Sequence, residues 1–452
     1  MKRKGTKGSG AGAGPENPGR RRIIAASSSA MAVAAMAADP PAARPDAASS
    51  GSAVLDAAWA SYWGDFAKIR AMVHDNPLYG HDEGTRTDAN HWLHQMLYVG
   101  HSLAVQPRQL YPIFYSTVFQ YPLHNTFGMP APDNTFGLAL IDGTRKYRIW
   151  GRRNNVHSVT IVVHHGFWGD ANSDMMKEYQ LDDFELAADG SYEIIASAQR
   201  VPGNWIEIDP ASRNVAIIVR HSHLDWEKEQ KAEMHIERVD LDDDRPNPRL
   251  GEAELAARIV TAGRVMLRMA HMNNLVPGAI LGNTGGAYNT FVDLNGPAVN
   301  KFGTFSRAHY CNAVYEFAAG EALIIEAADP GPETWFFNFQ LGDIWYQTDD
   351  YVFHQTSLNS SQVARDADGA VRAVIAERDP GVPNWLDPLE RRFGVVVFRV
   401  YGPAQVRMPV VKRVPAADLR AHLPADTPVV TGNQRREALR RRRQGAMRRF
   451  GF

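Results

Sequence analysis

Between residues 107 and 411 the chain reads as a succession of short β-strands, with one long helix between two groups of them. Runs such as TFGLALI, KYRIW, SVTIVVHH, YEIIAS, WIEI and VAIIVRHSH are rich in β-branched and aromatic residues, and Asp-Gly, Pro-Gly and Asn-Asn pairs separate them. Strands that follow one another without helices between them favour antiparallel sandwiches over βαβ units. The sequence therefore predicts a mainly β protein, an antiparallel β-sandwich or jelly-roll-like fold with an α-helical N-terminal part.

The two groups of strands repeat three features at a nearly constant spacing. An Asp-Gly pair, an Asn-Trp pair and an arginine that ends an apolar run occur once in each group, in the same order. The features are Asp189-Gly190, Asn204-Trp205 and Arg220 in the first copy, and Asp368-Gly369, Asn384-Trp385 and Arg399 in the second. Asp-Gly suits a tight hairpin turn, because glycine accepts a positive φ. We therefore expect two related β halves joined by a helix.

A fourth pair of similar segments predicts a difference in length between the two copies. YQLDDF at 179–184 resembles FQLGDI at 339–344, but this pair is more closely spaced than the other three features. The difference in spacing predicts an insertion of 19 residues in the second copy.

Helical periodicity marks three other segments. The first has apolar residues at helical spacing, namely Leu55, Trp59, Tyr62, Phe66 and Ile69. The second runs from 88 to 105, with Asp88 as the expected N-cap, and the third spans 252–274. We expect a signal peptide and linker at 1–52, a helical segment at 53–106, a first β half at 107–250, a helix and linker at 251–298, a second β half at 299–415 and a basic tail at 416–452.

The charge distribution limits the choice of partners. The net charge of the 452 residues is −1, but residues 1–22 carry +6 and residues 434–452 carry +7, which leaves −14 for the rest. An acidic body disfavours nucleic acid as a partner, and it offers an internal partner for the arginine-rich C-terminal tail, which we expect to pack on it. The alternative for the tail is attachment to an anionic lipid or nucleic acid. A single cysteine, Cys311, excludes an intramolecular disulfide. The sequence contains no run of 18 apolar residues, so we predict no membrane-spanning helix.

The N-terminal residues have the three parts of an export signal. Arg20-Arg21-Arg22-Ile23-Ile24 precedes a mildly apolar Ala/Ser run and the small-x-small sequence Ala35-Met36-Ala37. This order resembles a twin-arginine signal and predicts a periplasmic or secreted protein that begins near Ala38. The alternative is a low-complexity tail on a cytoplasmic protein.

Several motifs together resemble a known family. They are Asp133-Asn134-Thr135-Phe136, Tyr147-Arg148-Ile149, Gly151-Arg152, Asp189-Gly190-Ser191-Tyr192-Glu193, Asn204-Trp205, Arg220 with Asp225-Trp226, and the stretch DPGVPNWL at 379–386. Over most of 54–443 the chain resembles the larger bacterial members of the domain of unknown function 1214 family. The resemblance implies a β-sandwich, in some members a jelly roll, and supplies no catalytic residue. Phe136 replaces an expected tyrosine, and His221 and His223 replace residues expected not to be histidine.

Two sets of residues could serve an enzyme. His221, His223 and Asp225 alternate along a strand and are candidate metal ligands, with His164, His165 or His354 to complete the site. The pairs Asp182-Asp183 and Asp349-Asp350 could divide general acid and base roles. A polar outer face and turn residues explain both sets better, so we expect no cofactor, and a hydrolase or lyase is the second hypothesis.

Aromatic residues are dense between 335 and 353 and could form the walls of a ligand site with few polar anchors. The same rings could instead fill the sandwich core. The candidate ligand-binding residues are Trp335, Trp345, Tyr346, Tyr351, His354, Asn204, Asn384, Arg220 and Arg399. The leading hypothesis is therefore a binding protein for a small apolar or carbohydrate-like ligand, an accessory in catabolism. A structural or assembly module is the third hypothesis.

Overall fold

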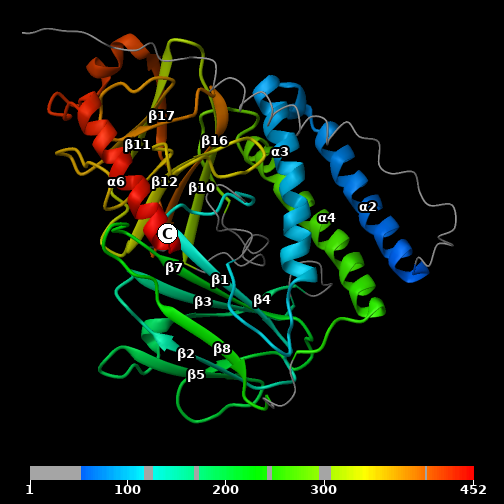
Figure 1. Ribbon diagram of the computed structural model, residues 1–452. Coiled ribbons are helices and arrows are strands. Elements are labelled where there is room, and N and C mark those ends of the chain that lie inside the picture. The colour runs from blue at the N-terminus through cyan, green and yellow to red at the C-terminus, as the bar shows by residue number, and fades with distance from the viewer. Residues whose placement is uncertain are drawn as a thin grey trace, which may run out of the picture. The chain divides into compact units, whose positions relative to one another are not determined.

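The computed structural model describes residues 52–116, 126–166, 173–241, 247–294, 307–402 and 405–451 (Figure 1). Residues 53–452 form one compact unit. The expected export signal and linker lie outside the described residues, apart from Ser52. Within the described residues, no helix combines the length and the apolar character needed to cross a membrane.

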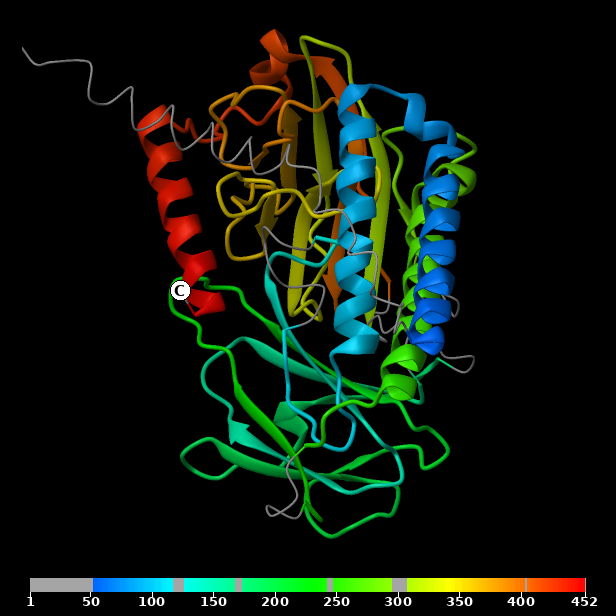
Figure 2. The ribbon, with the colours of Figure 1, turned by 45° about the vertical axis from the view of Figure 1, so that its right-hand side comes forward.

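Three long helices form a layer beside the strands. They are α2 (Ala53–His74), α3 (Glu83–Gly100) and α4 (Glu252–Asn283), with the short helices η1 (Pro77–Gly80) and η2 (His101–Val105) next to α3. Figures 1 and 2 show α2 alongside α4, and α4 also contacts strand β10 of the second half. Trp92 and Met96 of α3 pack with Ile69 of α2 and Met266 of α4 in one buried cluster. The helical stripes of the sequence therefore bury their apolar faces against one another and against the sheets.

The first β half has two four-stranded sheets. One sheet has the order β1-β7-β3-β4 and the other has the order β6-β5-β2-β8. The strands are β1 (Asn134–Ile141), β2 (Tyr147–Arg152), β3 (Ser158–His164), β4 (Met175–Gln180), β5 (Ser191–Ser197), β6 (Trp205–Glu207), β7 (Val215–Ser222) and β8 (Glu233–Arg238), with η3 (Leu181–Asp183) after β4. Ile149, Ile161 and Ile217 belong to one core that both sheets line, so the half is a sandwich.

The second β half repeats this topology. Its sheets have the orders β10-β16-β12-β13, with β9 added at the β10 edge, and β15-β14-β11-β17. The strands are β9 (Val292–Asp293), β10 (Ala308–Glu316), β11 (Glu321–Ala327), β12 (Phe336–Gly342), β13 (Ser357–Asn359), β14 (Val371–Ala376), β15 (Trp385–Leu386), β16 (Phe393–Tyr401) and β17 (Val410–Pro415). Each strand of the first half thus has a counterpart at the same place in a sheet, with β7 matching β16 and β1 matching β10. The predicted fold class, mainly β with a helical N-terminal part, is confirmed.

The strands nearest the helices are covered on both faces. On β16, Phe398 faces the sandwich core, whereas Val397 faces the cluster that contains the helices. On β7, Ile217 faces the sandwich core of the first half, and Ile218 faces the cluster that contains the helices. Burial on both faces explains why VAIIV and GVVVF are continuous apolar runs rather than alternating ones.

Two predicted helix boundaries are wrong. Helix α3 begins at Glu83, because Asp82 is its N-cap and accepts a hydrogen bond from the Thr85 backbone at 2.6 Å. The expected cap, Asp88, lies inside the helix and forms an ion pair with Arg391. Helix α4 continues past the expected end at 274 and through Pro277, whose buried ring packs without ending the helix.

The predicted 19-residue insertion is also wrong. Arg220 pairs with Thr160 on β3, and its counterpart Arg399 pairs with Asn338 on β12. The separation along the sequence between Thr160 and Asn338 is almost the same as that between Arg220 and Arg399. The second copy therefore has no insertion of this size between β12 and β16. The echo between 179–184 and 339–344 compares the end of β4 with the end of β12, which occupy different places in the two halves.

The C-terminal segment folds back onto the second half and the turn after β7. Residues Ala416–His422 form η4, and helix α6 (Gly432–Phe450) begins at the Thr431–Gln434 capping box. Arg435, Arg442 and Arg449, two helical turns from one to the next, are buried on one face of α6. Arg435 pairs with Asp379 at 3.0 Å. The other arginines of α6 are exposed.

Candidate ligand-binding cavity

A cavity of about 630 Å³ lies where α4 meets the inner strands of both β halves. Helix α4 provides one wall, β1 and β7 provide a second, and β10 and β16 provide a third. The apolar side chains that line it include Phe127, Met129, Phe136, Ile218, Met269, Met272, Leu275, Val276, Ala279 and Leu294. An apolar concavity of this volume with a few polar groups is typical of a small-molecule site.

Two of the predicted ligand-binding residues, Arg220 and Arg399, line this cavity together. They occupy equivalent positions on β7 and β16, and each has an aromatic cross-strand partner. The guanidinium carbon of Arg220 lies 5.5 Å from the ring centroid of Phe136, and that of Arg399 lies 5.9 Å from the ring centroid of Tyr310. The packing of two similar halves against one helix thus brings two arginines from distant parts of the sequence to one site.

A third predicted residue, Tyr346, reaches the cavity from a strained turn. Asp343 organises this turn, because its side-chain Oδ1 atom accepts hydrogen bonds from the backbone of Trp345 at 2.9 Å and of Gln347 at 3.1 Å. Tyr346 consequently has a φ of +61°, which is unfavourable for a residue with a side chain. Its hydroxyl donates to Asn312 at 3.1 Å, and burial raises the pKa of Tyr346 to about 12. The phenol therefore stays protonated at neutral pH.

Two buried amides also belong to the polar lining. Asn134 and Asn273 are 4% and 2% exposed and line the cavity. The Oδ1 atom of Asn134 and the Nδ2 atom of Asn273 have no hydrogen-bond partner within the described part of the chain. A buried polar atom without a partner is costly, so each amide is a position where a bound molecule would gain a hydrogen bond.

The other aromatic candidates lie elsewhere and make structural contacts. Trp345 donates to the Thr85 carbonyl at 2.8 Å and fixes the start of α3. Tyr351 packs against Trp226 beneath α6. Trp335 packs with Tyr401 at the edge of the second half.

His354 and the two asparagines also lie away from the cavity. The Nδ1 atom of His354 is 2.8 Å from Asp387 near the surface. Asn204 and Asn384 each close a corner, and each side chain bonds three backbone groups. Trp205 and Trp385 follow at these corners, each beneath an arginine whose guanidinium carbon is 5.2 Å from the ring centroid. Trp385 is buried and Trp205 is half-buried.

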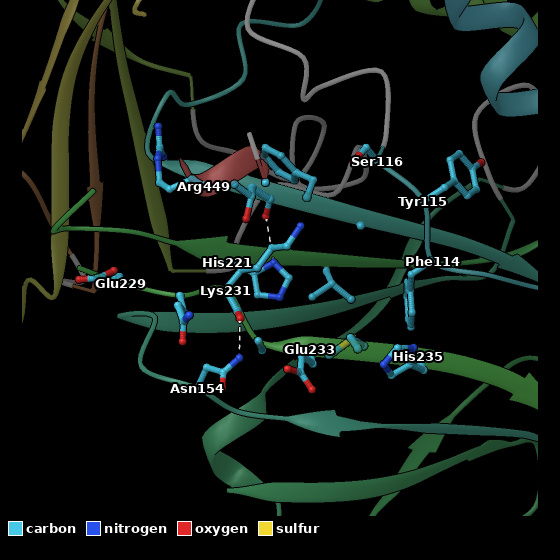
Figure 3. A pocket seen from close by; sticks show the side chains of 18 of the residues that line it. Phe114, Tyr115, Ser116, Asn154, His221, Glu229, Lys231, Glu233, His235 and Arg449 are labelled. Atoms are coloured by element: carbon cyan, nitrogen blue, oxygen red, sulfur yellow. Dashed lines mark hydrogen bonds between the residues drawn. The ribbon is translucent and has the colours of Figure 1, made fainter. Parts of the chain in front are cut away.

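The candidate metal ligands do not converge. His221 points into a second pocket of about 420 Å³, which residues 229–235 and the end of α6 also line (Figure 3). His223 is buried with its Nε2 atom 3.2 Å from the Thr135 hydroxyl, and Asp225 pairs with Lys228 at 3.1 Å. Among the residues that the structure describes, no group of three His, Cys, Asp or Glu side chains is placed to bind a metal.

The acidic pairs are engaged in ion pairs and turns. Asp182 pairs with Arg153, and Asp183 accepts a hydrogen bond from the Gln180 backbone. Asp350 accepts one from the Val352 backbone. The two acids of each pair thus face different partners.

Asp349 belongs to a buried cluster with Asp88, Asp343 and Arg391. Arg391 bonds both Asp349 and Asp88. Burial and the nearby charge of Asp88 raise the pKa of Asp343 to about 8, and burial also raises the pKa of Asp349. The cluster fastens α3 to the second half.

Sequence reasoning missed the contribution of α4 to the cavity. Arg268, Asn273 and Val276 line it from this helix, and Met129 lines it from the segment before β1. The apolar periodicity of 252–274 predicts a packed helix but does not indicate which face of the helix borders a cavity. The one indication in the sequence was that Asn273 is a polar residue within an apolar stripe.

The fold defines a mainly β protein of two topologically equivalent sandwiches and a helical layer. Residues 344–405 match the family model described as a protein of unknown function, DUF1214. The resemblance is confirmed over these residues, which contain the corner of Asn384 and the cavity residues Tyr346 and Arg399.

A solved structure agrees with this fold. An uncharacterised protein of Burkholderia cenocepacia is 26% identical, with 80% of this chain and 98% of that chain covered and a TM-score of 0.73. A protein of Vibrio parahaemolyticus is 13% identical, with 62% of this chain and 89% of that chain covered and a TM-score of 0.39. Comparison with curated proteins gives no match.

Proposed function

We propose that the protein binds a small, predominantly apolar molecule in the cavity between α4 and the two β halves. The observation that carries this proposal is the combination of an apolar lining with polar groups that both halves contribute, among them Arg220, Arg399 and Tyr346. Sites of this kind use apolar walls for affinity and the polar groups for orientation. The small share of polar groups favours an apolar ligand over a carbohydrate, which needs many hydrogen bonds.

We also propose that binding takes place outside the cytoplasm, as an accessory step in catabolism. The basis for the location is the signal-like order of residues 20–37. A binding protein of this kind would capture or present an apolar compound that dissolves poorly in water.

The binding proposal can be tested with the neutral apolar fluorophore N-phenyl-1-naphthylamine. Ala279 is exposed and lines the cavity, whereas Ala257 is exposed on the same helix outside the residues that line it. Ala279→Trp should weaken binding on the order of tenfold, because the indole occupies the opening of the cavity, and Ala257→Trp should bind like the wild type. Absence of fluorophore binding to the wild type, or equal binding by the two variants, would contradict the proposal.

A further inference from the structure

We infer that the ligand of this cavity is an amphipathic anion, an apolar body that carries one carboxylate-like group, and that the negative group contacts Arg399 and Arg220. This inference rests on the proposed binding function and specifies the class of ligand.

Arg399 is buried among neutral hydrogen-bond acceptors. Its side chain is 3% exposed, and it donates to the Gln340 side chain and, at 2.5 Å, to the Met129 carbonyl. Both acceptors are neutral, and none of the ion pairs among the described residues includes Arg399. A buried guanidinium retains its charge, and an uncompensated buried charge is costly. An anion in the cavity would supply the missing compensation.

The cavity lining carries several arginines. Arg220, Arg268 and Arg399 come from three different elements, β7, α4 and β16. The described residues that line the cavity include no aspartate or glutamate. The excess of positive charge among the described lining residues favours a negative ligand, although the protein is acidic overall outside its two termini.

The side-chain amide of Asn273 is a further hydrogen-bond donor in the lining. Its Nδ2 atom is buried at the cavity and has no partner among the described residues. The hydroxyl of Tyr346 is already committed to Asn312. An anion that accepts from the guanidinium groups has further lone pairs for this amide, because a carboxylate accepts as many as about four hydrogen bonds.

The apolar part of the ligand follows from the apolar side chains of the lining. Met269, Met272 and Val276 lie along one face of α4, and Phe127 and Ile218 lie on the β side. Methionine side chains adapt to chains of different shape. A linear or branched hydrocarbon attached to the anionic group fits this lining better than a compact inorganic anion, which would leave the apolar walls wet.

Calorimetric titration with decanoate and 1-decanol tests the inference, because the two probes share the hydrocarbon chain and differ in charge. The wild type should bind decanoate on the order of tenfold more tightly than decanol, the effect of one charge-assisted hydrogen bond in a buried site. Arg399→Gln and Arg220→Gln should lose this preference and keep decanol binding. Arg264→Gln, an exposed arginine of α4 outside the residues that line the cavity, is the matched control and should keep the preference.

The outcomes separate the two proposals. Equal affinity of the wild type for decanoate and decanol would overturn the anion inference and leave the binding function standing. Failure to bind either probe would contradict the binding function itself. Because Arg399 is buried and its replacement could unfold the protein, Arg220→Gln, at a half-buried position, provides the second test, and unchanged decanoate preference in that folded variant would also overturn the inference.

Discussion

Asn204 and Asn384 make the same three side-chain hydrogen bonds in the two β halves. Each accepts from one backbone amide, of Glu185 or Ala364, and donates to the carbonyl of that same residue. Each also donates to a carbonyl of the neighbouring strand, at Glu193 or Arg372. The separation along the chain between Glu185 and Glu193 equals that between Ala364 and Arg372. The two corners are therefore built in the same way.

The first prediction concerns these corners. Asn384→Ala should lower the free energy of unfolding by about 1–3 kcal/mol, because it leaves buried backbone groups without partners. Asn204→Ala should cost less, since its corner is more exposed to water. Urea denaturation measures both. Asn283→Ala, at the exposed end of α4, is the control, and a loss at Asn384 no larger than at Asn283 would contradict the prediction.

The second prediction concerns the buried arginines of α6. Arg442 donates to the Tyr351 carbonyl at 2.6 Å and lies over Trp226, with its guanidinium carbon 4.6 Å from the ring centroid. Burial lowers its pKa to about 10, so it remains charged at neutral pH. Arg442→Ala should destabilise the protein by about 2–4 kcal/mol, whereas the exposed Arg441→Ala should stay near the wild type. Thermal and urea unfolding of both variants would show the difference.

The third prediction concerns the tail as a whole. A chain that ends at Thr431 lacks α6 and should melt at a lower temperature, with no change in binding to anionic vesicles or to nucleic acid. The reason is that the buried arginines contact the protein itself, and the acidic body repels polyanions. Unchanged melting together with the loss of a salt-sensitive vesicle or nucleic-acid interaction would support attachment instead.

The fourth prediction concerns Asp343. Its pKa in the folded protein, about 8, lies above the ordinary value of 3.8, so the folded state binds more protons than the unfolded state between these values. Asp343 therefore makes stability fall as pH rises from about 4 to 8. Asp343→Asn should remove this decline and be more stable than the wild type at pH values above 8, by thermal melting. Asp350→Asn, outside the buried cluster, should keep the wild-type profile.

The fifth prediction concerns acid stability. Burial lowers the pKa of both His164 and His221 to about 4, below the ordinary 6.5. The unfolded state then binds more protons between these values, so this contribution to stability is lost as pH falls from about 6.5 to 4. His164→Gln and His221→Gln should each flatten the loss. His91→Gln, at an exposed position on α3, should not change it, and an equal effect at all three positions would count against the prediction.

The order of elements and the repeated corners could be predicted from the sequence. The runs TFGLALI, SVTIVVHH and VAIIVR coincide with β1, β3 and β7. Hairpin turns and asparagine corners involve residues that are neighbours along the chain or along one hairpin, so their signals are local. The helix boundaries were harder to predict, because the choice of cap at Asp82 and the continuation of α4 through Pro277 depend on packing as well as on local preference.

The cavity was decided by the tertiary structure alone. Arg220 and Arg399 are far apart in sequence, and they line one cavity because two similar sandwiches pack on one helix. The aromatic residues near 335–353 illustrate the same point. Trp345 faces α3, whereas Tyr346, the next residue, faces the cavity, because the turn that Asp343 organises sends consecutive side chains to opposite sides. A sequence determines which residues form each strand, turn and corner through local interactions, but the residues that share a site depend on contacts between distant segments.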